Sequence, residues 1–197
     1  MSLQAGTGLP MSRAYEEIQE LFAAFGMHAY LGEDVTQEDH ALQTANLAVT
    51  SQAPDSLVVA ALLHDIGHIL VEDAHGAHYS NVDAHHDDVG AKWCEERFGP
   101  TVAEPIRWHV AAKRFLVSSD PSYMSSLSDA SLHTLHLQGG PMDTDEMNQF
   151  RSQPGYQDAI QLRLWDDMAK VPGRDVPGLS TYRETIDACA ARAANSE

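Results

Sequence analysis

The sequence predicts an all-α fold, organised as one helical bundle. Apolar residues recur at spacings of three and four positions along most of the chain, and the alternation typical of strands is nearly absent. Thr36 and Asp143 are each followed three positions later by an acidic residue, a pattern typical of helix starts. There is no internal repeat and no low-complexity linker, which favours a single bundle.

Start and stop signals define the expected helices in order. An apolar stripe over residues 14–25 follows the cap candidate Ser12, and Thr36 begins the helix that carries His40. Residues 54–56 start the helix that leads to His64, and the helix with His86 starts at Asp83 and stops at Gly99-Pro100. Pro105 lies in the first turn of the helix with His109, and Gly139-Gly140 stop the helix with Ser131. The last three starts are Asp143, Gly155 for a helix that runs to Lys170, and Thr181.

Length and charge restrict the classes of function. The chain has 197 residues, 43% of them hydrophobic, so we expect one domain, over residues 11–197. Residues 1–10 are rich in Gly and Thr, and we expect a flexible tail there. Twelve basic and 29 acidic residues give a formal charge of −17. This charge argues against nucleic acid or an anionic membrane as a partner, because phosphate-binding surfaces need clustered Lys and Arg. A small anionic substrate needs only one or two local cations and remains compatible.

The cysteines and the apolar segments predict a cytoplasmic protein. Cys94 and Cys189 lie far apart and form no CxxC pair, which is typical of a reduced chain. We expect neither a membrane span nor a signal peptide, since no apolar run is long enough and no basic-then-apolar leader is present.

The dipeptide His64-Asp65 is the most informative feature of the sequence. It ends the apolar helical run 58–63, and His68 follows one turn later. An ionised carboxylate in apolar surroundings is costly unless it is paired or binds a metal, and its two oxygens allow it to bridge two cations. An isolated His-Asp pair is equally well interpreted as a helix-end cap. Further candidate ligands lie on other expected helices, which favours a metal site: His40, His86, His109 and Asp166.

Mixed imidazole and carboxylate ligands suit iron, manganese or zinc better than calcium. Groups spread over five helices converge only in the core of a bundle. With Asp65 as the bridge, the expected ligands are His40, His64 and Asp166 for one metal and His86 and His109 for the other.

Two of these ligands have open alternatives at the level of sequence. His85 precedes His86 in a polar run and competes with it for the same role. His109, beside Trp108, is also compatible with a packed core imidazole.

Polar side chains near the expected metals suggest an anionic substrate. Lys113 lies one helical turn after His109, so its ammonium can point along the same face. Ser131, Thr134 and Gln138 form a polar stripe at positions i, i+3 and i+7 of another helix. The alternatives are a solvated lysine at a helix end and an ordinary wet helix face.

In their order, these residues resemble the HD-domain superfamily, whose commonest members are metal-dependent nucleotide phosphohydrolases. The closer resemblance is to the mixed-valent di-iron HD-domain oxygenases of phosphonate breakdown. The matching stretches run in order from residue 30 to residue 170: Tyr30-Leu31-Gly32-Glu33, residues 62–68, His86 with Val89-Gly90-Ala91, residues 109–114, Gln138-Gly139-Gly140 and Arg163-Leu164-Trp165-Asp166.

The resemblance implies an HD-type bundle with a di-metal site in its core, and it supports all six ligands. It implies two iron ions, Fe(II) and Fe(III), with dioxygen as co-substrate. The expected reaction cleaves the carbon–phosphorus bond of (1R)-1-hydroxy-2-(trimethylamino)ethylphosphonate, or of its 2-amino analogue, to give phosphate and glycine betaine or glycine. Glu33 and Tyr30 suit either substrate, and we favour the trimethyl form because little beyond Glu33 offers a directional acceptor for a primary ammonium.

The resemblance also implies roles around the metals. The expected substrate-binding residues are His68, Lys113, Ser131, Thr134, Gln138 and Arg163. Tyr30 would occupy an open iron position when substrate is absent, and Glu33 would hold Tyr30 or meet the cationic nitrogen of the substrate. With Asp65 these two form the expected catalytic set, and Arg163 would orient Asp166 or steady the Glu33 region.

Two other functions compete with the oxygenase. The same ligands suit a metal-dependent phosphohydrolase of nucleotides, although hydrolysis requires neither a second metal at His86 and His109 nor Tyr30-x-x-Glu33. A catalytically silent nucleotide-sensing module is the third interpretation.

Overall fold

The computed structural model describes residues 13–30, 33–75 and 85–195, and over these residues the all-α prediction is confirmed. The α-helices are α1 (Ala14–Phe25), α2 (Gln37–Thr50), α3 (Asp55–Leu63), α4 (Ile66–His75), α5 (His86–Phe98), α6 (Pro100–Ser119), α7 (Asp129–Leu137), α8 (Thr144–Arg151), α9 (Tyr156–Met168) and α10 (Arg183–Ala194), with the 3-10 helices η1 (Tyr123–Ser126) and η2 (Leu179–Tyr182). The expected tail 1–10 and the start signals Ser12 and Asp83 lie outside the described residues.

The helix α3 lies at the centre of the bundle. It is apolar all round, and every residue from Leu57 to Leu63 is buried, as expected for a helix enclosed by others. Helices α2, α6, α9 and α10 pack against it. The central position of α3 brings His64 and Asp65, which follow its last residue, into the interior.

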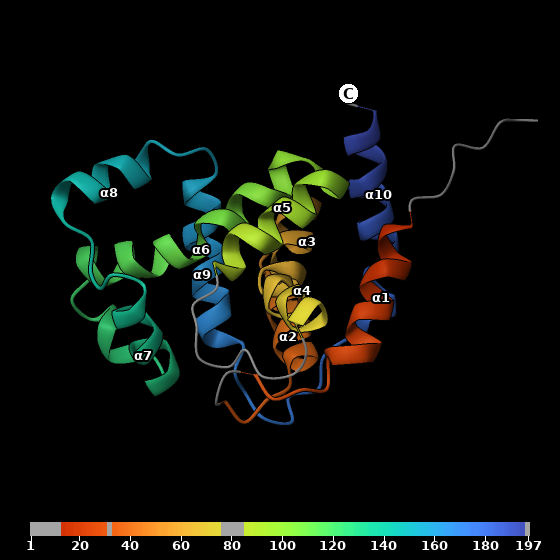
Figure 1. Cartoon of the computed structure of the whole chain (residues 1–197), viewed down its shortest axis with the longest axis horizontal. Helices are drawn as coiled ribbons and strands as arrows, with labels where there is room; N and C mark the ends of the chain where they lie inside the picture. Colours follow the sequence, from red (N-terminus) through yellow and green to blue (C-terminus); the bar gives the residue numbers. More distant parts are fainter. Residues whose placement is uncertain (1–12, 31–32, 76–84, 196–197) are drawn as a thin grey trace, which may run out of the picture.

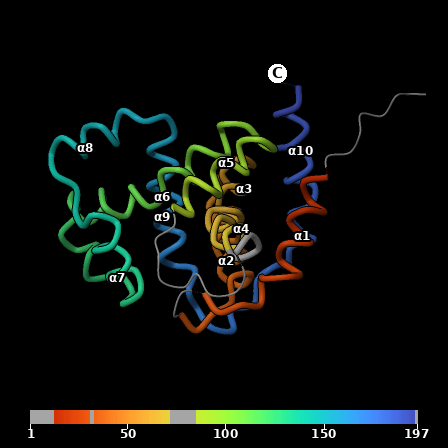
Figure 2. Tube along the Cα trace, in the orientation of Figure 1, coloured from red at the N-terminus to blue at the C-terminus, as the bar shows by residue number. Residues whose placement is uncertain are grey.

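The remaining helices extend the bundle in two directions. Helices α1 and α10 lie at one edge, and α7 and α8 lie at the opposite edge (Figure 1). The trace in Figure 2 follows the 20-residue helix α6 from α5 near the centre toward the edge formed by α7 and α8. In the described part of the chain, no helix combines the length and apolar character that crossing a membrane requires.

Two predicted helix starts are confirmed in detail. The Asp39 backbone N–H donates to Thr36 Oγ1 over 3.0 Å, and the Thr36 N–H donates to the Asp39 carboxylate over 3.3 Å. Asp143 and Glu146 exchange the equivalent bonds over 2.8 and 2.9 Å. Each capping box satisfies backbone donors that a helix start leaves without intrahelical partners.

The predicted start of the fifth helix was wrong. Pro105 does not lie in a first turn, because α6 already begins at Pro100 and contains Pro105 in its interior. Pro100 satisfies the preference for proline at the first helical position equally well. A single residue, Gly99 with φ 73°, separates α5 from α6. The helix therefore loses one backbone hydrogen bond at Pro105 and continues.

Candidate di-metal site

The six expected ligands converge on one place in the interior. Asp65 lies between α3 and α4, and its side chain is 12% exposed, whereas the other five residues are buried. His40 lies on α2, His64 follows the last residue of α3, and His86 is the first residue of α5. His109 lies on α6 and Asp166 lies on α9.

The two oxygens of Asp65 face different imidazole pairs. Asp65 Oδ2 lies 3.6 Å from His40 Nε2 and 3.3 Å from His64 Nε2. Asp65 Oδ1 lies 3.5 Å from Nε2 of both His86 and His109. The structure thus divides the imidazoles into the two groups expected from the sequence, with the carboxylate between them.

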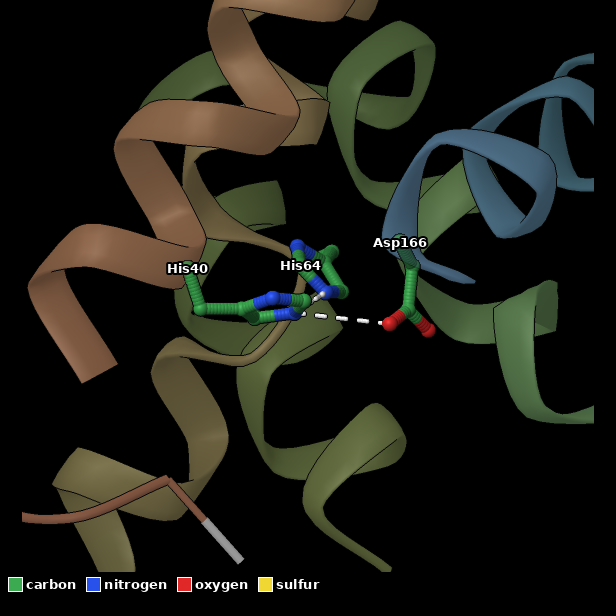
Figure 3. Close-up of side chains that lie close together, drawn as sticks. All are labelled: His40, His64 and Asp166. Atoms are coloured by element: carbon green, nitrogen blue, oxygen red, sulfur yellow. Dashed lines mark hydrogen bonds and ion pairs between the residues drawn. The ribbon is translucent and has the colours of Figure 1, made fainter. Parts of the chain in front are cut away.

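Asp166 completes the group around His40 and His64. Figure 3 shows the three side chains pointing toward one another from separate parts of the fold. Asp166 Oδ1 lies 3.4 Å from His40 Nε2, while Asp166 Oδ2 forms an ion pair with Arg163 Nη1 over 2.7 Å. One oxygen is therefore held by a guanidinium and the other faces the imidazoles.

Backbone carbonyls determine the tautomers of three histidines. Nδ1 lies 3.0 Å from the Ala169 carbonyl in His40, 3.0 Å from the Ala61 carbonyl in His64, and 2.6 Å from the Ile106 carbonyl in His109. A carbonyl only accepts, so each neutral ring carries its proton on Nδ1 and presents a lone pair at Nε2.

The Nε2 atoms then approach one another too closely for an apolar contact of neutral rings. The separation is 3.1 Å between His40 and His64 and 3.3 Å between His86 and His109. The tautomers of His40 and His64 place two lone pairs opposite each other, which requires a cation or a proton between them. Asp65 outweighs burial and raises the pKa of His64, whereas burial lowers the pKa of His109. The nitrogen and carboxylate donors in each group fit a metal ion.

Both carboxylates are held in the ionised form. Burial alone would raise the pKa of Asp65, but the imidazoles of His64 and His109 outweigh it and hold the pKa well below its usual range. For Asp166, Arg163 and then Lys170 outweigh burial in the same direction. Ionised carboxylates next to imidazoles form a ligand set suited to a transition metal.

Two glycines allow the close helix crossing that positions His86. A Cβ atom on Gly67 in α4 would lie 1.9 Å from the His86 carbonyl oxygen, and one on Gly90 in α5 would lie 3.1 Å from the Gly67 nitrogen. Only residues without side chains permit this approach. The crossing places the start of α5 against the turn that carries Asp65.

The structure favours His86 over its neighbour in sequence. His85 adopts a left-handed φ of 51° before the helix, and its side chain is 82% exposed. The second alternative concerned His109, beside Trp108. His109 is buried and faces Asp65, while Trp108 donates a hydrogen bond to Glu104 over 2.8 Å.

One aromatic or imidazole ring covers each half of the site. Tyr30 stacks on His40 with a centroid distance of 4.0 Å, and its hydroxyl donates to Asp65 Oδ2 over 2.7 Å. His68 stacks on His86 at 3.9 Å. Burial, together with Asp65, raises the pKa of Tyr30 well above its usual value, whereas burial and His86 lower the pKa of His68 to about 3. Both rings are therefore neutral at pH 7.

Glu33 joins the loop that carries Tyr30 to helix α7. Its carboxylate accepts a hydrogen bond of 2.6 Å from Ser128, the residue whose side chain caps α7. The Glu33 backbone N–H donates to the Tyr30 carbonyl over 2.7 Å. Glu33 is thus placed between Tyr30 and the helix that carries Ser131.

Four of the expected substrate-binding residues lie near Asp166, namely Lys113, Ser131, Thr134 and Arg163, whereas His68 lies against His86. Lys113 is buried and donates to Thr134 Oγ1 over 2.8 Å. Arg163 Nη2 donates to Ser131 Oγ over 3.3 Å. Gln138 Oε1 is buried and accepts no hydrogen bond from the residues that the structure describes. Cationic and polar groups thus line one side of the candidate metal site.

Sequence reasoning missed two residues of this region that lie on α9 or just after it. Asp167 pairs with Arg163 and accepts from the Tyr123 hydroxyl over 2.5 Å. Lys170 Nζ lies 3.3 Å from Asp166 Oδ1 and 3.1 Å from Ser131 Oγ. The i,i+4 spacing from Asp166 to Lys170 is a signal that could have identified the lysine.

Gln43 is a third missed residue, and it positions His40. Its amide donates to the Val171 carbonyl over 3.0 Å and accepts from the Val171 N–H over 3.1 Å. These two bonds fix the segment whose Ala169 carbonyl holds His40 Nδ1. A glutamine one turn after a candidate ligand, on a buried helix face, was the available signal.

Comparison with known proteins identifies similar chains. The HD domain family model matches residues 27–130. The chain is 42% identical over 177 residues to hydroxymethylphosphonate dioxygenase of Gimesia maris, covering 88% of each chain. It is 39% identical over 162 residues to [1-hydroxy-2-(trimethylamino)ethyl]phosphonate dioxygenase (glycine-betaine-forming) of Leisingera caerulea, covering 82% of this chain and 83% of that protein.

Proposed function

Because this chain belongs to the HD-domain family, together with these phosphonate dioxygenases, we propose that it cleaves the carbon–phosphorus bond of a 1-hydroxyphosphonate with dioxygen. The observation that carries the proposal is the position of Asp65, whose two oxygens each face a pair of imidazole nitrogens. This arrangement suits two metal ions that share one carboxylate. Hydrolysis of a nucleotide does not require the second imidazole pair.

We propose iron as the metal at both positions. The ligands of one ion would be His40, His64 and Asp166, those of the other His86 and His109, and Asp65 would be shared. Bound iron would supply a Lewis acid for the substrate hydroxyl and electrons for dioxygen.

The residues beside the metals would bind and orient the phosphonate. Lys113 supplies a buried positive charge, and Thr134, which accepts from it, fixes the direction of the ammonium. Ser131 lies on helix α7, and Gln138 is the residue that caps the end of this helix. The same cations would stabilise the charge of the departing phosphate. Neutral His68 would add a hydrogen bond without adding charge.

Tyr30 would act as a gate in this scheme. Its hydroxyl is bonded to Asp65 Oδ2, at the edge of the group that contains His40. Substrate would displace the tyrosine from this position. Glu33, which accepts a hydrogen bond from Ser128 at the start of α7, would then couple substrate binding at α7 to the displacement of Tyr30.

We propose the trimethylammonium compound as the preferred substrate. The Tyr30 ring and the Glu33 carboxylate offer the aromatic face and negative charge that a quaternary ammonium prefers. The Leisingera caerulea relative is named for this compound, whereas the relative from Gimesia maris is named for hydroxymethylphosphonate, which has no nitrogen. Values of kcat/KM for the trimethylamino, amino and hydroxymethyl compounds decide between them.

Oxygen dependence tests the reaction. We expect one dioxygen to be consumed for each phosphate released, because the carbon next to phosphorus is oxidised from an alcohol to a carboxylate. Labelled dioxygen should place one labelled atom in the carboxylate product, as mass spectrometry would measure. Phosphate release under strict anaerobiosis, or release from nucleotides at a comparable rate, would show that the site is hydrolytic.

The role of Lys113 predicts both an affinity change and a pH dependence. Lys113→Ala should weaken phosphonate binding about tenfold to a hundredfold, the value of a charge-assisted hydrogen bond, while both metals remain bound. Burial, and then Arg163, lower the pKa of Lys113 to about 7. Only the protonated form attracts the anion, so kcat/KM should fall as the pH rises above about 7.

The matched control for this prediction is Lys113→Arg. A guanidinium stays charged throughout this pH range, so the fall in kcat/KM above neutral pH should largely disappear. Ionisation of the substrate itself is common to all variants and cancels in the comparison. Equal affinity of wild type and Lys113→Ala would show that the lysine does not contact the anion.

A further inference from the structure

Lys170 lies among oxygen atoms of three side chains. The chain has three lysines, of which Lys92 is exposed and Lys113 and Lys170 lie beside Asp166. Lys170 Nζ lies 3.1 Å from Ser131 Oγ, 3.3 Å from Asp166 Oδ1 and 3.6 Å from Asp167 Oδ1. The contact with Ser131 Oγ is a hydrogen bond, and the contacts with the two carboxylates are ion pairs. The ammonium of Lys170 is thus engaged by groups of the protein itself.

The consequence falls on the hydroxyl of Ser131. A serine hydroxyl has two lone pairs and one proton. Arg163 Nη2, at 3.3 Å, and Lys170 Nζ, at 3.1 Å, both approach Ser131 Oγ, and neither group can accept a hydrogen bond. Both lone pairs are therefore occupied, and the hydroxyl proton has to point in a third direction. Ser131 can then act toward a ligand only as a donor.

The contact between Lys113 and Thr134 differs from that between Lys170 and Ser131. The Thr134 hydroxyl accepts from Lys113 over 2.8 Å and donates to the Ser131 carbonyl over 3.2 Å, so both of its functions are directed at the protein. Of the two hydroxyls, Ser131 is the one whose proton remains available. An oxyanion is the ligand that accepts from such a donor without offering a proton of its own.

We propose that Lys170 is a positioning residue of the anion site, which together with Arg163 fixes Ser131 as a hydrogen-bond donor toward the substrate oxyanion. The identity of the anion as a phosphonate, or as the phosphate released from it, rests on the proposed function. The role of Lys170 is separate, because it depends on the contacts of Ser131. Lys170 acts through Ser131, whereas Lys113 touches the anion.

Binding of inorganic phosphate to the metal-loaded protein tests this role without turnover. Isothermal titration calorimetry would be applied to wild type, Lys170→Met, Ser131→Ala and the double variant. We expect Lys170→Met to weaken phosphate binding about tenfold, as for loss of a well-oriented charge-assisted bond. In the Ser131→Ala protein, the same change should cost less than about twofold, since the group through which it acts is gone.

Three further measurements separate this role from a structural one. Lys170→Arg keeps a cationic donor and should restore most of the affinity. Lys92→Met changes the net charge equally at an exposed site and should leave phosphate binding unchanged. Metal content should match wild type in every variant, because Arg163 still holds Asp166.

The outcomes distinguish failure of this inference from failure of the proposed function. An equal loss of affinity on Lys170→Met with and without Ser131 would show that Lys170 acts by charge alone, and would overturn the inference. Loss of iron from Lys170→Met would assign the lysine to Asp166 and would also overturn it. Wild-type protein that carries both metals but binds no phosphate would overturn the anion site itself.

Discussion

Replacing Asp65 with alanine is expected to abolish turnover and to reduce the bound metal from two ions per chain to one or none. Asp65 is the residue whose oxygens face both imidazole pairs, at 3.3 to 3.6 Å from the four Nε2 atoms. Without it, each cation would lose an anionic ligand and the two would repel across an apolar interior. The loss should exceed the roughly 10–100-fold cost typical of changing a residue that only supports a ligand.

Metal analysis and activity on the same preparation check this expectation. Asp88→Ala is the matched control, because Asp88 is an exposed carboxylate at the start of α5. It should keep both metals and full activity. Thermal melting of the metal-free proteins would show whether Asp65→Ala still folds. An Asp65→Ala protein that binds two ions and turns over would refute the shared-carboxylate arrangement.

The helical fold was predictable because its signals are local. Capping boxes, apolar stripes and the all-apolar run of α3 are each written within a dozen neighbouring residues, and the structure confirms them. Pro105 shows where this approach fails. Two prolines in one segment both satisfied the rule for a helix start, and the helix begins at Pro100.

The candidate site was predictable to the extent that its residues carry unusual chemistry in apolar surroundings. Histidines and an aspartate within buried helices indicated that a cluster would form, and the structure brings the six together. The choice between His85 and His86 depended on the crossing of α4 and α5 at Gly67, a tertiary contact that no periodicity encodes.

Residues that act on the ligands were harder to find. Gln43 and Lys170 are ordinary polar residues by sequence, and their roles arise from partners far along the chain: Gln43 bonds Val171, and Lys170 bonds Ser131. The direction of a hydrogen bond between distant segments becomes visible only once the fold is known. The sequence placed Arg163 beside Asp166 but did not indicate that two carboxylates depend on it.

Arg163→Met is expected to destabilise the protein strongly even without metals. Arg163 is buried, forms an ion pair with Asp166 over 2.7 Å and also pairs with Asp167. Removing it would leave two neighbouring carboxylates with Lys170 as the nearest cation. Breaking a buried ion pair costs about 3–5 kcal/mol, and at roughly 2–4 °C per kcal/mol for a chain of this size the melting temperature should fall by roughly 6–20 °C.

The pH dependence of this deficit identifies its cause. The charge of Arg163, with Lys170, holds the pKa of Asp166 below its unfolded value, so the pair stabilises the folded state above that value and loses its effect as the pH falls. The gap between wild type and Arg163→Met should therefore be widest near neutral pH and should narrow below about pH 4, where unfolded aspartates become protonated. Calorimetric melts of the metal-free proteins across this range would measure the gap, with Arg192→Met, which removes an exposed partner of Asp55, expected to change little. A deficit of constant size at all pH values would mean that Arg163 contributes by packing rather than by charge.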